Sequence, residues 1–523
     1  MYKVVIPSAG KGARLKDLSK HINKALVSVN QKPSISYVIE KFPEEIEIVI
    51  ALGYQGDSIK DFLLIAYPNR KFTFVDIDLY EGEGSGLGYS LLKCQDYLDC
   101  PFIFIPNDSI IEEEIPSPDI NWMGYSTLHD TTQYRSLNIL NGFVDNILPK
   151  ESSGDVYPYI GLCGIKDHKL FWKNMNEGIN KGSIEIGESY GLKMLLTSKK
   201  IIAEKFTWHD TGNLPSLDEA KRHLPKNQVD AHILDKPDES IWFCNEKVIK
   251  FHIDKSFISE RVIRADSLRG YVPPITHYSD NMYAYDLIEG SVLSRRPTPK
   301  VFSSFLDYMS NFWIKPDAKN INMKNFYEGC SKFYKDKTYE RLDLFLKRFE
   351  VIDREIIIND IKVPKYKKVL ELIDWDDMKT GMPVRFHGDL HFENILCTHD
   401  KESPFFLLDW RQNFAGELNF GDIYYDLAKL NHGLIISHEI INNNQFNIDV
   451  HPDRVDFDFH RKHLLSDCQE TLQTWVIKND YDWLKVKKLT NLIFLNIAPL
   501  HDHPYSLLLY YFGLSSLWND LNN

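Results

Sequence analysis

The chain has 523 residues, more than one hydrophobic core normally organises, so two or three domains are expected. Hydrophobic residues make up 43% of the sequence and aromatic residues 13%, which is ample for packed cores. The net charge of −13 lacks the basic character that nonspecific nucleic-acid binding requires, so no nucleic-acid partner is expected.

Cysteine usage and apolar runs indicate the compartment. The seven cysteines are dispersed, with no Cys-x-x-Cys pair, which favours reduced thiols in a cytoplasmic protein over a disulfide framework or a zinc site. The sequence enters an apolar strand at once, so no signal peptide is expected. No apolar run approaches the ~18 residues of a membrane span, so we expect no membrane insertion and interpret residues 505–514 as part of a buried helix.

The first part of the chain alternates short apolar runs with helical stretches. Strands are predicted at residues 3–7, 46–52, 71–76 and 101–106, and helices around residues 33–42, 55–66 and 86–98. This alternation predicts an α/β domain with a mostly parallel sheet. The glycine-rich loop after the first strand is weak evidence by itself, because a simple strand-to-helix turn has the same composition.

Four charged residues strengthen the interpretation of that loop. Arg14 ends the glycine loop and Lys24 precedes a helix, while Asp108 lies at the carboxyl end of the fourth strand, where open α/β sheets bind ligands. Asp210 follows much later, in a Trp-His-Asp-Thr-Gly-Asn segment. Together these residues resemble the sugar-nucleotide pyrophosphorylases and the related phosphocholine cytidylyltransferases, whose motifs are Gly-x-Gly-x-Arg, Pro-Lys-Pro/Ala-Leu and Asp-Thr-Gly.

The resemblance covers residues 1–222 and implies a Rossmann-like, mixed-sheet nucleotidyltransferase domain of the GT-A type. It implies that a nucleotide lies on the backbone of the glycine loop, at Ala9, Gly10, Lys11 and Gly12. Arg14 would hold the phosphates and Lys24 would neutralise their charge during displacement, both as catalytic residues. Asp108 and Asp210 would hold Mg²⁺.

The sequence departs from that family at two places. Asn23 stands where the family usually has proline, which is expected to change the local turn without removing Lys24. Residues 81–90 resemble the glycine-rich loop that contacts the base and the sugar, but their serine and tyrosine leave the base preference open. We expect CTP as the second nucleotide, with UTP, GTP and dTTP as alternatives.

A linker is predicted at residues 223–235 and a second domain at residues 236–523. Its first segment, residues 239–252, predicts two strands joined by an Asn-Glu turn. Lys250 occurs in Val-Ile-Lys-Phe, like the strand lysine that pairs nucleotide phosphates in kinases, and Glu260 on the next helix is its candidate partner. A solvated lysine and a surface glutamate remain the alternative.

Residues 283–290 are interpreted as a connector between two lobes, at about residues 236–290 and 291–523. Backbone groups from Asp286 to Ile288 would pair with adenine there. The second lobe is predicted to be mainly helical, with two strands at residues 394–396 and 405–408 around an active loop.

That active loop carries the clearest motif in the chain. Residues 385–394 read Arg-Phe-His-Gly-Asp-Leu-His-Phe-Glu-Asn, and Leu-Leu-Asp-Trp follows at residues 407–410. Phosphoryl transfer requires a base for the attacking hydroxyl, and an amide and a carboxylate for Mg²⁺. The spacing assigns these roles to Asp389, Asn394 and Asp409.

The motif resembles the aminoglycoside phosphotransferase and choline kinase superfamily, which implies a two-lobed, protein-kinase-like α+β fold and ATP as the donor. His387 and His391 are expected to brace the loop. Asp422 would support it, and Asp426 would either contact substrate or serve structure. Three aromatic residues would suit a cationic acceptor such as choline, although such residues usually belong to a core: Trp410, Tyr424 and Tyr425.

A kinase makes a phosphate monoester and a nucleotidyltransferase consumes one, so the sequence predicts a bifunctional enzyme. The acceptor would be choline, a polyol or a sugar, and the product an activated precursor for surface polysaccharide. An antibiotic phosphotransferase with an accessory domain and a scaffold of degenerate domains are the alternatives. The expected partners are small molecules and nucleotides, and homo-oligomerisation is left open.

Overall fold

The computed structural model describes residues 2–127, 132–152, 154–225, 238–317, 319 and 321–522. Their contacts divide them into two compact units. The first comprises residues 2–225, 238–255 and 276–287, and the second comprises residues 256–275 and 288–522. Most of the predicted linker lies outside the described residues, and the predicted domain boundaries stay a prediction.

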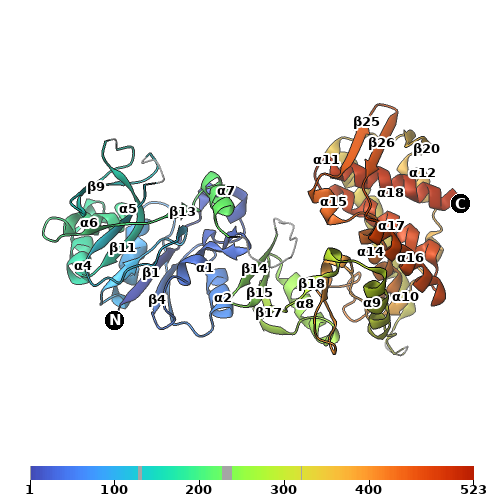
Figure 1. Ribbon diagram of the computed structural model, residues 1–523, viewed down its shortest axis with the longest axis horizontal. Coiled ribbons are helices and arrows are strands. Elements are labelled where there is room, and N and C mark those ends of the chain that lie inside the picture. Colours follow the sequence, from blue (N-terminus) through green and yellow to red (C-terminus); the bar gives the residue numbers. More distant parts are fainter. Residues whose placement is uncertain are drawn as a thin grey trace. The chain divides into compact units, whose positions relative to one another are not determined.

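The first unit is built on a mixed sheet with the strand order β5-β4-β1-β6-β11-β8-β12-β10-β9 (Figure 1). The four predicted strands are confirmed and run parallel: β1 (Lys3–Ser8), β4 (Ile48–Leu52), β5 (Phe72–Asp76) and β6 (Phe102–Phe104). The other strands of the sheet are β8 (Trp122–Tyr125), β9 (Ser136–Leu140), β10 (Phe143–Leu148), β11 (Tyr157–Ile165) and β12 (Ile202–Lys205). All five residues of β4 are buried, as expected for a strand covered on both faces.

The helices predicted in this part of the chain are also confirmed. They are α1 (Ser34–Ile39), α2 (Gly56–Ala66) and α3 (Leu87–Cys94). Later helices are α4 (His168–Glu177), α5 (Ser183–Ile186), α6 (Glu188–Leu195) and α7 (Leu214–His223). A separate two-stranded sheet of β7 (Ser109–Ile111) and β13 (Trp208–Asp210) joins the ends of two distant segments.

A second sheet of this unit has the strand order β14-β15-β17-β16. Its strands are β14 (Glu239–Cys244), β15 (Lys247–His252), β16 (Ile275–Tyr278) and β17 (Met282–Asp286). Asn245 and Glu246 both have positive φ, as a tight hairpin turn requires, so the predicted turn is confirmed. The predicted connector at residues 283–290 is wrong in its first half, because residues 283–286 complete β17.

The second sheet shares a hydrophobic core with helix α2 of the same unit. The ring of Trp242 lies edge-on to Phe62 of α2, with centroids 5.2 Å apart. The Tyr67 hydroxyl lies 2.9 Å from the Cys244 sulfur. Because Trp242 is fully buried, this contact removes a large apolar area from water and stabilises the unit.

The second unit is mainly helical, as predicted. Its longer helices are α8 (Lys255–Ser267), α9 (Pro299–Phe312), α10 (Met323–Ser331), α11 (Lys337–Phe349), α14 (Ile423–Ile435), α16 (His463–Lys478), α17 (Trp483–Ile497) and α18 (Tyr505–Asn522). The predicted strands occur as β22 (Ile395–Cys397) and β23 (Phe405–Leu407). None of the helices in the described residues combines the length and the hydropathy of a membrane span.

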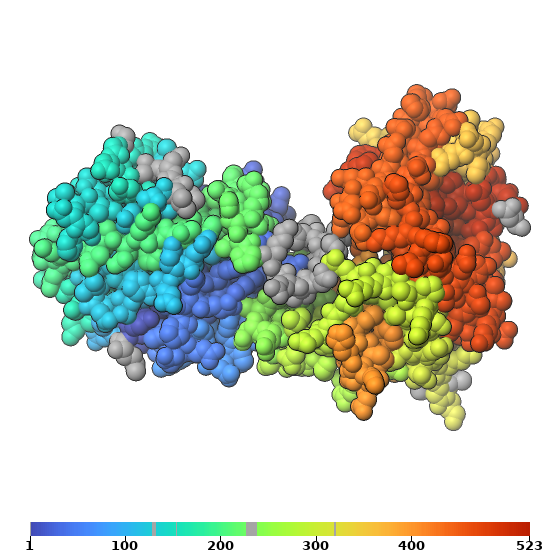
Figure 2. Space-filling view, in the orientation of Figure 1, coloured from blue at the N-terminus to red at the C-terminus, as the bar shows by residue number. Residues whose placement is uncertain are grey.

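A four-stranded sheet within this unit was not predicted. It has the order β20-β19-β26-β25, with β19 (Ile356–Ile358), β20 (Ile361–Val363), β25 (Phe446–Val450) and β26 (Arg454–Phe459). The hairpin of β25 and β26 stands at the surface, where Figure 2 shows it in orange, and only its Val455 is buried. The sequence of this hairpin does alternate, with Phe-Asn-Ile-Asp-Val in β25 and Val-Asp-Phe-Asp-Phe in β26, so a strand signal was present and was overlooked.

Candidate functional site

The first candidate site is centred on Lys24 and Asp108. Lys24 begins a short 3₁₀ helix, and its Nζ lies 2.8 Å from Asp108 Oδ2. Burial raises the pKa of Asp108, but the positive charges of Lys24 and Arg14 outweigh burial and hold that pKa below its ordinary value. The Asp108 carboxylate is therefore ionised at neutral pH.

Asn23 holds the turn that carries Lys24, at the position where the family that the sequence resembles usually has proline. Its amide Nδ2 donates to the carbonyl oxygens of Ser8, at 2.9 Å, and Tyr54, at 2.6 Å. Its Oδ1 accepts from the Ala25 N–H at 2.9 Å and so caps the turn. One buried side chain thus joins the end of β1 to the turn that carries Lys24.

The pairing of β7 with β13 brings together Asp108 and Asp210, the two residues predicted to bind a metal ion. Asp210 lies opposite Ser109, the neighbour of Asp108. A Cβ atom placed on Gly212 would lie 2.9 Å from Asp108 Oδ2, 3.1 Å from Asp210 Oδ1 and 3.3 Å from an Arg14 nitrogen. Three charged groups therefore converge on one backbone position that only glycine leaves open.

These carboxylates suit a magnesium ion, since hard divalent cations prefer oxygen ligands. Asp210 is held in place by the Tyr134 hydroxyl, which donates to its Oδ2 at 2.9 Å, and by the Gly212 N–H, which donates to its Oδ1 at 3.0 Å. Tyr134 was missed in the sequence, where no motif distinguishes it. No cluster of three or more His, Cys, Asp or Glu side chains able to hold a metal occurs within the described ranges.

The glycine loop has the open backbone expected of a phosphate-binding loop. A Cβ on Gly10 would meet nothing within 4 Å, whereas a Cβ on Gly12 would lie 2.7 Å from the Lys24 Cβ. Gly12 also has φ +67°, a backbone conformation that glycine adopts easily. Glycine at this position therefore allows the turn and also leaves room for the Lys24 side chain. Ala9 is buried and accepts the Tyr54 N–H at 2.9 Å, while Lys11 forms an ion pair with Glu81. The nucleotide-binding roles of this loop stay a prediction.

The second candidate site, in the other unit, is centred on Asp389. Lys429 of α14 places its Nζ 2.7 Å from Asp389 Oδ1. Burial raises the pKa of Asp389, but Lys429 and His391 outweigh burial and hold it well below its ordinary value. Lys429 was missed, although it follows Asp426 by three residues on the same helix face, a spacing that places both at the active loop.

The two histidines of the motif differ in charge. Burial lowers the pKa of His387 to about 3, so this ring is neutral; its Nε2 lies 2.9 Å from the Leu408 carbonyl and its Nδ1 accepts the Asp389 N–H at 3.2 Å. Burial lowers the pKa of His391 as well, but hydrogen bonds to Asp389 and Glu393 dominate and raise it to about 9. His387 therefore braces the loop, as predicted, and His391 adds a positive charge beside Asp389.

Asp426 has a structural role. Its carboxylate accepts the N–H groups of His387 and Gly388 at 2.8 and 2.7 Å, and the Trp313 indole N–H at 3.0 Å. Burial raises the pKa of Asp426 to about 6, against the lowering effect of these hydrogen bonds. Asp426 is fully buried, and these contacts hold the backbone of residues 387 and 388.

Asn394 and Asp409 offer the oxygens that a magnesium ion needs. The Asn394 amide Nδ2 donates to the Asp389 carbonyl at 2.9 Å, and the Leu408 N–H donates to the Asn394 carbonyl at 2.8 Å. Asp409 has φ +59°, a strained conformation typical of functional positions. Its Oδ1 lies 2.5 Å from Arg261, a contact not anticipated from the sequence.

The other residues predicted to contact a nucleotide are Lys250, Glu260 and Asp286 to Ile288. Lys250 is buried in β15 of the first unit, and Glu260 of the second unit accepts the Asn413 amide at 2.6 Å, so the Lys250–Glu260 pair stays a prediction. Asp286 accepts a hydrogen bond from Lys247 at 2.7 Å. The adenine contact predicted for Asp286 to Ile288 also stays a prediction, with the Leu287 N–H already donating to the Glu246 carbonyl.

Comparisons with known proteins concern about half of the chain. No protein-family model matches the chain. The "Bifunctional protein GlmU" of Methanocaldococcus jannaschii is 25% identical over 253 residues, 47% of this chain and 60% of that protein. The UTP–glucose-1-phosphate uridylyltransferase AglF of Haloferax volcanii is 25% identical over 115 residues, 22% of this chain and 46% of that protein.

Among solved structures, the CTP:phosphocholine cytidylyltransferase from Streptococcus pneumoniae is 20% identical, with a TM-score of 0.36, and covers 42% of this chain and 99% of its own. The chain spans 60% of the length of the first curated relative, the protein from Methanocaldococcus jannaschii. The N-terminal half of the chain is similar to nucleotidyltransferases.

Proposed function

We propose that the chain is a bifunctional enzyme that phosphorylates a small hydroxyl compound and then activates the product with a nucleotide. The C-terminal unit would transfer a phosphoryl group from ATP. The N-terminal unit would transfer a nucleotidyl group, CMP from CTP in the preferred form, and release pyrophosphate. The observation that carries this proposal is the convergence of Arg14, Asp108 and Asp210 on Gly212, with Lys24 on the same carboxylate.

The N-terminal chemistry follows from those charges. A phosphate monoester attacks the α-phosphorus of the nucleoside triphosphate, and the bond to pyrophosphate breaks. Lys24 and Arg14 offset the repulsion between the two anions, and Lys24 acts from a partly buried position beside Asp108. A magnesium ion on Asp108 and Asp210 would neutralise further phosphate charge.

The C-terminal chemistry relies on the ionised state of Asp389. Its ionised carboxylate orients the acceptor hydroxyl and takes the proton as the oxygen attacks the γ-phosphorus. Lys429 and His391 keep Asp389 ionised, while His387 and Asp426 hold the loop backbone. Asn394 and Asp409 would hold a magnesium ion, which would supply positive charge to the nucleotide phosphates.

A sugar kinase joined to a UTP-, GTP- or dTTP-dependent pyrophosphorylase is the second candidate, favoured by the name of the Haloferax relative. An antibiotic phosphotransferase with an accessory domain is less favoured, since it predicts a degraded first site. The contact between Lys24 and Asp108 supports an intact one.

A coupled assay tests the proposal. The protein is given ATP, one of CTP, UTP, GTP or dTTP, and an acceptor from a panel of choline, polyols, sugars and their acids. Pyrophosphate release that requires both nucleotides and an unphosphorylated acceptor supports two consecutive steps. Asp108→Asn should lose only pyrophosphate release. Asp389→Asn should lose ADP formation but should still release pyrophosphate when the acceptor is supplied already phosphorylated. The proposal fails if no acceptor consumes ATP, if Asp108→Asn loses ADP formation, or if Asp389→Asn loses pyrophosphate release from the phosphorylated acceptor.

A further inference from the structure

We infer that the acceptor of the proposed phosphotransferase carries a negatively charged group, a phosphate or a carboxylate, bound in a cationic cavity beside Asp389. The inference rests on the proposed function and names its substrate class. It favours polyol phosphates, sugar phosphates and hydroxy acids over choline.

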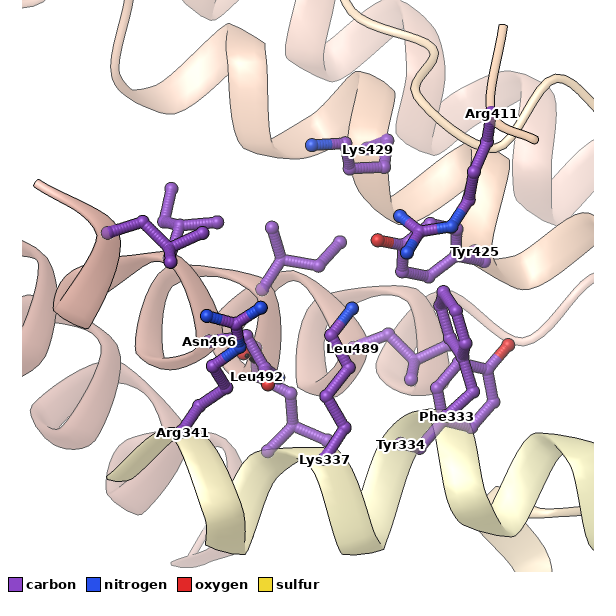
Figure 3. Close-up of a pocket in the computed structure, with 13 residues that line it drawn as sticks. Phe333, Tyr334, Lys337, Arg341, Arg411, Tyr425, Lys429, Leu489, Leu492 and Asn496 are labelled. Atoms are coloured by element: carbon purple, nitrogen blue, oxygen red, sulfur yellow. Dashed lines mark hydrogen bonds between the residues drawn. The ribbon is translucent and has the colours of Figure 1, made fainter. Parts of the chain in front are cut away.

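The cavity lies wholly within the second unit, among α11, α14, α17 and the segment after Asp409. It has a volume of about 160 Å³, the scale of a small metabolite and below that of drug-sized pockets. Figure 3 shows Lys337 and Arg341 extending from one helix toward the space that Lys429 and Arg411 also face.

The charge of the lining is one-sided. Lys337, Arg341, Arg411 and Lys429 all line the cavity, and no aspartate or glutamate does so among the described residues. Lys429 is neutralised by Asp389, whereas no ion pair to a carboxylate occurs for the other three within the described part of the chain. The buried Arg411 Nε also has no hydrogen-bond partner there. Like charges gathered in this way repel each other until an anion occupies the space between them.

The titration of Lys337 agrees with that crowding. Burial lowers its pKa, and the positive charges of Arg411, Arg341 and Lys429 lower it further, to about 7. Each of these neighbours is within electrostatic reach of Lys337. A bound anion would reverse their effect and favour the charged lysine.

Two aromatic rings of this region are already engaged by the protein itself. Trp410 is fully buried, and its indole N–H donates to the Arg261 carbonyl. In the cavity, the Phe333 ring is already approached by Lys337 Nζ at 4.4 Å and by the Arg411 guanidinium at 4.8 Å from its centroid. Since the protein's own cations take that ring, a choline headgroup would meet repulsion there.

Lys429 connects the cavity to the reacting centre. Its side chain lines the cavity, and its Nζ lies on Asp389. An acceptor with its anionic group among Arg341, Arg411 and Lys337 would therefore direct a hydroxyl toward Asp389. That hydroxyl oxygen forms the new bond to the γ-phosphorus, the bond to the bridging oxygen breaks, ADP leaves, and the proton passes to Asp389.

Matched acceptors test the charge requirement on the full-length protein. Pairs such as glycerol and glycerate, glucose and gluconate, and glucose and glucose 6-phosphate differ in the anionic group, and choline supplies the opposite charge. We expect ADP formation with a kcat/KM at least tenfold higher for the anionic member of a pair. A preference for choline, or for the neutral member of each pair, would overturn the inference.

Two variants of α11 test whether the preference for an anionic acceptor depends on the cavity. Arg341→Gln should raise the KM for the anionic acceptor at least tenfold with little change in kcat. Lys347→Gln removes the same charge from an exposed position of α11 outside the cavity and should leave both constants unchanged. If Arg341→Gln raises the KM for ATP instead, the cavity serves the nucleotide and the inference is wrong.

A binding measurement separates this inference from the proposed function. Isothermal titration calorimetry with inorganic phosphate should detect a binding site. Arg341→Gln should weaken its affinity for phosphate at least tenfold, and Lys347→Gln should not change it. If that site is found but no acceptor consumes ATP, the phosphotransferase proposal fails while the anion site stands. If an acceptor consumes ATP but phosphate binding is the same in Arg341→Gln, the anion site is wrong and the phosphotransferase stands.

Discussion

Lys24 Nζ lies 2.8 Å from Asp108 Oδ2, although the two residues are 84 positions apart in the chain. The contact depends on the end of β6, the loop after β1 and the Asn23 side chain at the same time. It gives the first site one fixed cation next to one ionised carboxylate, close to Arg14 and Asp210.

Lys24→Met should reduce the rate of pyrophosphate release by about 10²- to 10³-fold, because a preorganised positive charge is lost where phosphate charge develops. ADP formation should not change, since Lys24 belongs to the first unit. Single-turnover rates of both steps measure this. Lys24→Arg keeps the charge and should retain more activity than Lys24→Met; equal loss in both would contradict a mainly electrostatic role.

Lys429→Met should shift the pH dependence of ADP formation. Lys429 lowers the pKa of Asp389, so its removal raises that pKa, and the carboxylate becomes protonated at a higher pH. The acidic limb of the kcat/KM profile should therefore move to higher pH. Lys429→Arg keeps a positive charge and should leave the limb near its wild-type position. An unshifted limb in Lys429→Met would show that Asp389 is not the group that titrates.

Glu188→Gln should stabilise the first unit at alkaline pH. Burial raises the pKa of Glu188 to about 7, against an ordinary value of 4.5. The stability that this group contributes in its protonated form is complete below pH 4.5 and is lost as pH rises to about 7. At pH 8 the variant should thus gain roughly 2–3 kcal/mol over wild type, and at pH 4.5 little. Thermal unfolding at both values checks this; an equal difference at both would refute the assignment.

Trp242→Ala should destabilise the first unit by about 3–5 kcal/mol, because it removes a fully buried ring packed on Phe62. Pyrophosphate release should then be lost at a lower temperature than ADP formation. Phe345→Ala, which removes a buried ring stacked on Tyr510 in the second unit, should have the reverse effect when pyrophosphate release is measured with an acceptor that is already phosphorylated. If Trp242→Ala lowers only the temperature at which ADP formation is lost, β14 does not stabilise the first unit.

The sequence predicted the local elements of the first unit well. β1, β4, β5 and β6 are short apolar runs between turn residues, a pattern typical of strands. The motif residues could also be identified in the sequence, because Asp389, Asn394 and Asp409 occur at fixed short spacings. The hairpin of β25 and β26 was missed although its apolar and polar residues alternate, because the whole lobe was expected to be mainly helical.

By itself the sequence determined the glycine loop, the strand order along the chain and the identity of the charged motif residues, because these depend on local propensity and short spacing. The tertiary structure alone decided that Lys429 lies on Asp389, that Asp210 meets Asp108, and that four cations line one cavity. Contacts of this kind arise from packing between distant segments, and no local pattern encodes which side chains the packing brings together.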